Sequence, residues 1–267
     1  MSQPREGAGE LLRAGKLDAA IAAANAGLRG DPASLGKRIL LAELLLFAGN
    51  LARADVILDA ASQVDPTAAI AVAEFRQLLR AETARRQHRR DGRVPEFIGE
   101  PTPALRASLA ASVATRAGDT AAARCAAEAE AVRPRVPGRA GDAPFDDFRD
   151  ADDLYAGFFE ILTTTGKYFW IPTERVVSIE FRATRRPRDL VWRGAGVSVE
   201  NGPDGEVYLP AIYDADRPEL GDEFRLGRAT EWRGPESGPV VGIGQRVFLV
   251  GEEARNIMDL TTLQFGT

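Results

Sequence analysis

GKLDAAIAAANAGLRGDP, from Gly15 to Pro32, returns in outline as GNLARADVILDAASQVDP, from Gly49 to Pro66. The opening glycine, the leucine two places later, an internal alanine and the closing Asp-Pro pair match in register at a spacing of 34 residues. A period of 34 is that of tetratricopeptide (TPR)-like repeats, in which each unit is a hairpin of two helices. The first third of the chain is therefore predicted to contain one such unit built twice.

Each matched residue has a physical role in a helical hairpin. A glycine after an apolar helix adopts the left-handed conformation that ends it, and Gly15 and Gly49 both follow apolar runs. Small residues such as Ala20 and Ala54 allow the paired helices to approach closely. The Asp-Pro pair stops the second helix, because proline lacks the N–H and disfavours helix in the residue before it. GKRILLAELLLFAG, residues 36–49, is accordingly predicted to be the first helix of the second unit.

The helical pattern continues beyond the second repeat. A helix is predicted from about Ala68 to Arg90 as the first arm of a third unit, and RVPEFIGEPTP interrupts it. A degenerate hairpin follows over residues 103–134, with Gly118 as its turn. Repeat units stack because they cannot bury their apolar faces alone. Residues 1–140 are thus predicted to form a TPR-like α-helical repeat domain.

The pattern of the sequence changes near residue 140. RPRVPGRAGDAPFDD, residues 133–147, is rich in proline, glycine and arginine and is predicted to be a linker. Beyond it, short runs with a period of two, such as RVVSIEF and EVYLPAIY, indicate strands. One helix is expected to precede them, at about Asp153 to Thr165. The predicted fold class is α+β, in which residues 141–267 form a small, mainly antiparallel β domain with one leading helix.

The composition is that of an ordinary globular protein, with 45% hydrophobic residues, 27% charged residues and a net charge of −5. No apolar run approaches the ~20 residues that span a bilayer, and the first residues lack the pattern of a signal peptide. The single Cys125 leaves no internal disulfide and no multi-cysteine metal site. These features predict a cytoplasmic protein, and nothing in the sequence indicates a cofactor.

Five segments occur in an order and at spacings that resemble those of a known family. They are DFRDADDLYAGFFEILTTTGKYFWIP, RPRDLVW, VYLPAIY, GRATEW and GIGQR. In these segments and in its N-terminal repeats, the chain resembles the ImpE family, also called TagJ or SciE, of type VI secretion accessory proteins. The resemblance runs from about Leu11 to the final strand, and the segment from Arg89 to Pro103 matches least.

The resemblance implies an adaptor and not a catalyst. Family members are similar to proteins that bind the N-terminal helix of the small contractile-sheath subunit and help present contracted sheath to the hexameric AAA+ disassembly ATPase. The chain is therefore expected to be a non-enzymatic accessory protein of a type VI secretion system. Its expected partners are that helix and, directly or indirectly, the ATPase. No catalytic residue, metal, nucleic acid or membrane insertion is expected.

A groove for the partner helix is predicted on the repeats. In repeats of this period the first helix of each hairpin lines the concave side, where an amphipathic helix can lay its apolar face. The predicted contact residues share faces of two such helices, and they are Ile39, Glu43, Leu46, Phe47, Gln77 and Arg80. For Leu46 and Phe47, burial between the hairpins is an equally good explanation.

An acidic cluster keeps a second function open, that of a metal-dependent enzyme. DDFRDADD contains five aspartates, Asp146, Asp147, Asp150, Asp152 and Asp153, and carboxylates of this kind hold hard divalent cations. The simpler interpretation is that Asp150 or Asp152 caps the helix expected to follow. Carboxylates that converge on a pocket would favour the enzyme.

Arginine clusters keep a third function open, that of a nucleic-acid-binding module. The first cluster is most simply explained as a solvated helix face, and it comprises Arg85, Arg86, Arg89, Arg90 and Arg93. The second, Arg185, Arg186 and Arg188, lies beside Trp192, which can stack on bases. The simpler role expected of Arg188 is an ion pair with Asp189.

Two remaining features do not indicate a catalytic site. His88 is the only histidine, and it lies on the charged helix, far in sequence from Cys125, so a histidine-activated nucleophile is not expected. Gly242 and Gly244 imitate a dinucleotide-binding loop, but in a β-rich region they indicate a bulge or a close approach of strands.

Overall fold

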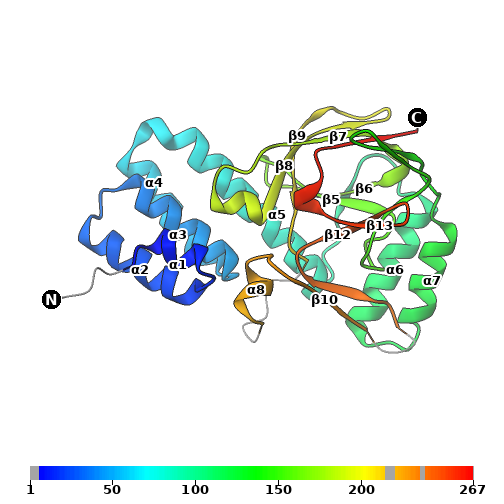
Figure 1. Cartoon of the computed structure of the whole chain (residues 1–267), viewed down its shortest axis with the longest axis horizontal. Coiled ribbons are helices and arrows are strands. Elements are labelled where there is room, and N and C mark those ends of the chain that lie inside the picture. Colours follow the sequence, from blue (N-terminus) through cyan, green and yellow to red (C-terminus); the bar gives the residue numbers. More distant parts are fainter. Residues whose placement is uncertain (1–5, 214–219, 235–237, 267) are drawn as a thin grey trace.

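The computed structural model describes residues 6–213, 220–234 and 238–266. Its N-terminal half is helical and its C-terminal half consists mainly of strands, which confirms the predicted α+β class (Figure 1). In the described residues the helices are α1 (Ala8–Arg13), α2 (Leu17–Gly30), α3 (Leu35–Phe47), α4 (Leu51–Val64), α5 (Ala69–Asp91), α6 (Pro103–Ala117), α7 (Ala122–Val132) and α8 (Asp222–Arg225). Short 3₁₀ turns are η1 (Pro66–Ala68), η2 (Thr173–Arg175), η3 (Pro187–Leu190) and η4 (Ile257–Asp259).

The repeated motif forms two helical hairpins, α1–α2 and α3–α4. Gly15 and Gly49 adopt φ of 76° and 74°. The residue after each donates its N–H to a carbonyl five residues back, at 2.9 Å in both hairpins. This arrangement ends the first helix with a left-handed turn and satisfies its last carbonyls. The TPR-like hairpins predicted from the 34-residue period are therefore confirmed.

The long helix α5 runs from the hairpins to the strands, where it contacts β5 and β6 (Figure 1). It follows the prediction of a helix over 68–90 closely and ends at Gly92, whose φ is 79°. The hairpin α6–α7 lies on the other side of the strand region from α1–α4 (Figure 1). The last hairpin therefore covers the strands and does not continue the stack.

Within the described residues, nine strands form the main sheet, in the order β1-β6-β5-β9-β8-β7-β14-β2-β3. All neighbours are antiparallel except β1 and β6. The strands are β1 (Glu96–Phe97), β2 (Gly138–Ala140), β3 (Ala143–Phe145), β5 (Phe158–Leu162), β6 (Tyr168–Pro172), β7 (Val176–Phe181), β8 (Trp192–Val199), β9 (Gly205–Pro210) and β14 (Thr262–Phe265). Two smaller sheets contain β4 (Phe148–Asp150), β12 (Val247–Val250) and β13 (Glu253–Asn256), and β10 (Thr230–Arg233) with β11 (Val241–Gly244).

One hydrophobic core joins the two halves of the chain. It contains the buried leucines of α2 to α5 together with Trp170, Trp192 and Tyr213 from the C-terminal half. Phe75 of α5 meets Trp192 edge to face, with ring centroids 5.9 Å apart. A second core lies within the β part, around Phe148, Phe159, Phe248 and Phe265. No helix in the described part of the chain is long and apolar enough to cross a membrane.

Two local predictions were wrong. The helix expected at 153–165 is a turn followed by strand β5, whose residues are all buried. Phe158–Leu162 pairs along its full length with β6, so burial on both faces overrides the helical pattern. The expected linker 133–147 contains β2 and β3, and Gly138 is needed there because a Cβ would lie 2.1 Å from the carbonyl oxygen of Gln264. These segments are part of the sheet.

Candidate partner-binding site

The six residues predicted to line the partner groove lie on α3 and α5, but only some of them reach the surface. Glu43, Leu46 and Phe47 are buried in the core. Ile39 and Gln77 are half-buried, and Arg80 is exposed. Leu46 and Phe47 therefore lie in the core and are not exposed in a groove.

The concave side of the hairpins is occupied by a segment of the chain itself. The turn η3 packs against α3. The guanidinium carbon of Arg188 in η3 lies 4.6 Å from the centroid of the Phe75 ring on α5. Trp192 follows and packs on the same ring. The motif RPRDLVW thus packs against the face that α3 and α5 share.

Glu43 is a buried carboxyl group with an incomplete set of partners. Among the described residues, its Oε1 has no hydrogen-bond partner. Burial raises the pKa of Glu43 to about 7, and the nearby positive charges of Arg188 and Arg186 oppose that rise. This residue faces η3 and therefore belongs to the internal contact.

An accessible groove lies instead along the outer side of α5, where it meets the start of α4. The groove has a volume of about 520 Å³. Its apolar floor includes Leu51 and Leu79, and its rim includes Asp55, Arg80 and Thr83. Arg80 is the predicted contact residue that the structure places in this groove. The Arg80 side chain donates a hydrogen bond to Gln77 Oε1 at 3.3 Å.

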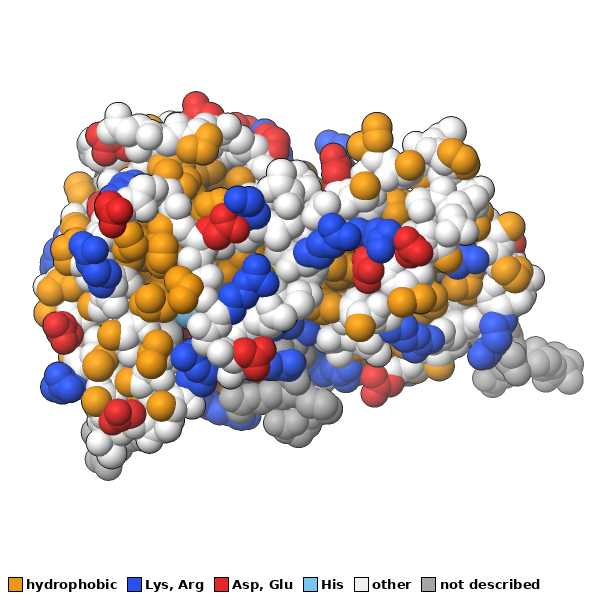
Figure 2. Space-filling view, turned by 180° about the vertical axis from the view of Figure 1, so that it is seen from behind, with side chains coloured by type: hydrophobic (Ala, Val, Ile, Leu, Met, Phe, Trp, Pro, Cys, Tyr) orange, Lys and Arg blue, Asp and Glu red, His pale blue; other side chains and the backbone are white. Residues whose placement is uncertain are grey.

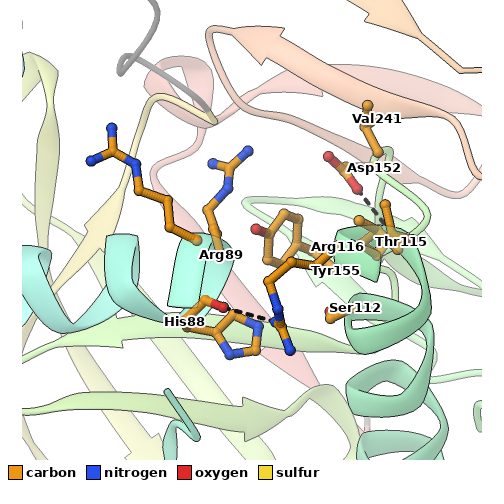
Figure 3. Close-up of a pocket in the computed structure, with 10 residues that line it drawn as sticks. His88, Arg89, Ser112, Thr115, Arg116, Asp152, Tyr155 and Val241 are labelled. Carbon is orange, nitrogen blue, oxygen red and sulfur yellow. Dashed lines mark hydrogen bonds between the residues drawn. The ribbon is translucent and has the colours of Figure 1, made fainter. Parts of the chain in front are cut away.

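A second cavity, of about 400 Å³, adjoins this groove at the end of α5 (Figure 3). Arg90 lines both openings. Figure 3 shows Arg89 pointing into the opening, while Arg116 of α6 reaches toward His88 and donates a hydrogen bond to its carbonyl oxygen at 3.1 Å. Asp152 and Tyr155 line the far wall. This cavity could not be predicted from the sequence, because its walls come from four segments that lie far apart in the chain, around residues 88–90, 112–116, 152–155 and 241.

His88 is buried below this cavity and does not lie on a solvated face. Its ring meets the Trp170 ring edge to face, with centroids 4.8 Å apart. Its Nδ1 lies 2.8 Å from the carbonyl oxygen of Arg93. Burial lowers the pKa of His88 and so favours the neutral ring. These contacts give His88 a structural role in the core.

The first arginine cluster is also buried in part, so its prediction as a solvated face was wrong. Arg85 Nε donates to Glu160 Oε1 at 3.0 Å, and its Nη2 donates to the carbonyl of Tyr213 at 2.9 Å. Arg86 Nε donates to Glu82 Oε1 at 2.9 Å. Buried charges persist only when they are paired and hydrogen-bonded. Arg85 therefore binds α5 to the β half, and Arg86 pairs within α5 and donates to the carbonyl of Gly49, so neither is available to phosphates.

The acidic cluster does not cap a helix, because no helix follows it. Asp152 accepts hydrogen bonds from the backbone N–H groups of Leu154 and Gly242, both at 2.9 Å. Asp150 lies 3.3 Å from Arg246 and accepts from the Tyr213 hydroxyl at 2.6 Å. Burial and the neighbouring Asp150 raise the pKa of Asp152 to about 7. Both carboxylates thus hold loops of the β half together.

The described residues contain no group of three or more His, Cys, Asp or Glu side chains placed to hold a metal ion. Figure 2 shows acidic, basic and hydrophobic side chains interspersed over the back of the molecule.

Two smaller predictions were also tested by the structure. The expected ion pair between Arg188 and Asp189 is not formed, because the Asp189 carboxylate accepts instead from the backbone N–H groups of Arg185 and Arg186. The expected close approach of backbone is found at Gly244, where a Cβ would lie 2.1 Å from the carbonyl oxygen of Ala229, whereas at Gly242 the close neighbour is the Tyr213 ring, at 2.4 Å.

Comparisons with known proteins agree with the sequence resemblance. A family model described as ImpE protein matches residues 142–264. The chain is 35% identical over 258 residues to the type VI secretion system accessory component TagJ of Pseudomonas aeruginosa, and the match covers 96% of this chain and 90% of that protein. The crystal structure of protein VPA1032 from Vibrio parahaemolyticus is similar with a TM-score of 0.90, at 26% identity over 97% of both chains.

Three observations agree with one another. They are the fold with its two repeated hairpins, the internal RPRDLVW segment and the match along nearly the whole chain. The chain belongs to the ImpE/TagJ family of type VI secretion accessory proteins.

Proposed function

We propose that this protein is a non-enzymatic adaptor that binds the N-terminal helix of the small contractile-sheath subunit of a type VI secretion system. In this role it acts in the cytoplasm and helps the AAA+ disassembly ATPase to handle contracted sheath. The observation that carries the proposal is 35% identity over 96% of the chain to a type VI accessory component. The surfaces described above supply a place for such a partner.

The partner helix is proposed to lie in the groove between α4 and α5. Between Leu79 and Asp91 the groove follows α5 for about 18 Å, or roughly three helical turns at ~1.5 Å per residue. An amphipathic helix of that length places its apolar residues on the leucines of the floor. This mode of recognition needs a preformed groove with apolar anchors and a polar rim.

The rim of the groove carries charges of both signs. Arg80 and Arg90 line the groove together with Asp55 and Asp91. A partner with charges of both signs can pair with this rim, and a mismatched charge costs affinity. Of the six residues predicted from the sequence, Arg80 lines this groove and is proposed to contact the partner directly. Gln77 lies partly exposed on α5, and Ile39 lies partly exposed on α3, which does not line the groove.

The test is a titration of this protein with a peptide copied from the first helix of its cognate small sheath subunit. We expect saturable binding that Arg80→Glu weakens by about tenfold, because a rim charge is reversed. Thr83→Arg, which places a long side chain in the groove, should weaken binding further. The matched control is Arg106→Glu, which reverses an exposed arginine on α6. Binding that survives both groove variants would move the site elsewhere, and no binding of the peptide would reject the partner.

The second part of the proposal concerns the ATPase. Contracted sheath, the cognate ATPase and ATP are combined with and without this protein, and the rate of sheath disassembly is measured by sedimentation. We expect a faster rate with the protein than without it. An unchanged rate with a saturating amount of protein would limit the role to sheath binding.

A further inference from the structure

A separate pocket of about 380 Å³ lies at the arginine-rich segment before η3. Four arginines of this one segment line it, and they are Arg182, Arg185, Arg186 and Arg188. Asp189 and Glu206 are the carboxylates in the lining, so the arginines outnumber them by two. The pocket therefore has an excess of positive charge.

One of the four arginines, Arg182, already has carboxylate partners. Arg182 is paired, since its guanidinium donates to Glu206 and, at 3.2 Å, to Glu180. Within residues 6–213, 220–234 and 238–266, no carboxylate forms an ion pair with Arg185 or Arg186, and both side chains are exposed. An oxyanion in the pocket would accept hydrogen bonds from these guanidinium groups and balance their charge.

Arg188 forms the inner wall of the pocket and is more than nine-tenths buried. One face of its guanidinium lies on the Phe75 ring. Its Nε has no hydrogen-bond partner among the described residues. Burial, together with the neighbouring Arg186, lowers the pKa of Arg188, and the nearby Glu43 carboxyl opposes this shift. A buried cation of this kind is stabilised when an anion pairs with it.

The backbone of the segment is held in place before any ligand arrives. The Asp189 carboxylate accepts from the N–H of Arg185 at 2.8 Å and from the N–H of Arg186 at 3.1 Å. Because the turn is fixed by Asp189, the arginines that flank it project from a rigid frame. Preorganisation of this kind lowers the entropy cost of binding.

We propose that this pocket binds the phosphate group of a small molecule. Guanidinium groups match the geometry of phosphate oxygens with parallel N–H donors, which is why arginine is favoured at phosphate sites. The volume lies at the lower end of the range for small-molecule pockets. Tyr208 lines the same pocket and offers a ring face beside the charged groups. The site is distinct from the groove on α5.

The experiment is isothermal titration of the whole protein with inorganic phosphate, pyrophosphate and a nucleoside triphosphate, each at constant ionic strength. We expect saturable binding of at least one of the three. The double variant Arg185→Gln, Arg186→Gln should weaken it by about tenfold or more, because two charge-assisted contacts are lost. Arg188→Met should do the same, while the control Arg106→Gln leaves affinity unchanged.

The probes also identify the source of the phosphate. Tighter binding of the nucleotide than of pyrophosphate assigns a nucleotide, and equal binding assigns the phosphate group alone. Absence of saturation with all three, or unchanged affinity in the double variant, would overturn the proposal. Binding of a DNA duplex without binding of pyrophosphate would overturn it as well. The double variant should still bind the sheath peptide, so failure here is separate from failure of the adaptor function.

Discussion

Several charged side chains lie in the interior of this protein. Glu43, Asp152 and Glu160 are carboxyl groups with almost no exposed surface, yet their environments differ. Glu160 is held between two guanidinium groups, whereas Glu43 has an oxygen with no partner in the described residues. The sequence places Glu43 and Glu160 in apolar runs, and such a charge within an apolar run is a signal of a buried polar contact, whereas Asp152 lies in an acidic cluster that carries no such signal.

Glu43→Gln tests the raised pKa of Glu43. In the folded protein that pKa is about 7, above the ordinary value of 4.5, so the folded state binds the proton more tightly than the unfolded state. Wild-type stability from this group is present below about pH 4.5 and is lost as the pH rises to 7. The glutamine amide in the variant does not titrate. Relative to wild type, it should therefore gain on the order of 2–3 kcal/mol in free energy of unfolding between pH 5 and pH 8.

Urea unfolding at several pH values measures this difference. Glu128→Gln, at an exposed position on α7, serves as the control and should show no such gain. A difference between Glu43→Gln and wild type that stays constant from pH 5 to pH 8 would contradict the prediction.

Gly242→Ala tests the close approach of β11 to a buried ring. The added methyl carbon would lie 2.4 Å from two ring atoms of Tyr213. The ring cannot shift easily, because its hydroxyl donates to Asp150 and accepts from the N–H of Val247. We expect a loss of about 2–3 kcal/mol in the free energy of unfolding. Gly205→Ala is the matched control, since no atom lies within 4 Å of its added carbon.

At the scale of elements, Glu160 connects three parts of the chain. It lies on β5 and pairs with Arg85 of α5 and with Arg246, which follows β11. Tyr168 of β6 also donates to it. Removal of one partner from a buried ionic group leaves the other charges uncompensated, which typically costs about 3–5 kcal/mol.

Glu160→Gln is therefore expected to lower the free energy of unfolding by about 3–5 kcal/mol, although it preserves the shape of the side chain. Thermal unfolding followed by circular dichroism gives the measurement. Glu180→Gln removes an exposed partner of Arg182 and should cost less than about 1 kcal/mol. Equal losses in the two variants would show that the buried pair does not stabilise the contact between α5 and the sheet.

Elements fixed by local signals could be predicted, and those fixed by distant partners could not. The hairpins follow from Gly15, Gly49 and the Asp-Pro pairs, all of which act within one turn of the chain. Strand β5 was mistaken for a helix because its pairing with β6 and its burial on both faces come from tertiary contacts. The contact of η3 with α3 could not be predicted for the same reason, since η3 lies about 150 residues later in the sequence.

At the scale of the whole molecule, the hairpins and the strands share one core. Phe75 of α5 packs against Trp192 of β8, and Trp192 Nε1 donates to Glu82 Oε2 at 3.2 Å. The predicted division into residues 1–140 and 141–267 cuts through this core and through the main sheet, to which β1 and β2 contribute. The similarity to VPA1032 extends over 97% of both chains with a TM-score of 0.90, so the relative placement of the two halves is shared by a protein with 26% identity.

This continuity predicts that the chain unfolds as one cooperative unit. Because the same buried side chains stabilise both halves, opening one half exposes the apolar surface of the other. Differential scanning calorimetry should therefore show a single transition with equal calorimetric and van't Hoff enthalpies. Trp192→Ala should shift that whole transition to lower temperature, since it removes a ring buried between the halves. Two resolved transitions, with only the later one sensitive to Trp192, would instead mean that the hairpins fold independently and that the RPRDLVW segment is a detachable occupant of their concave face.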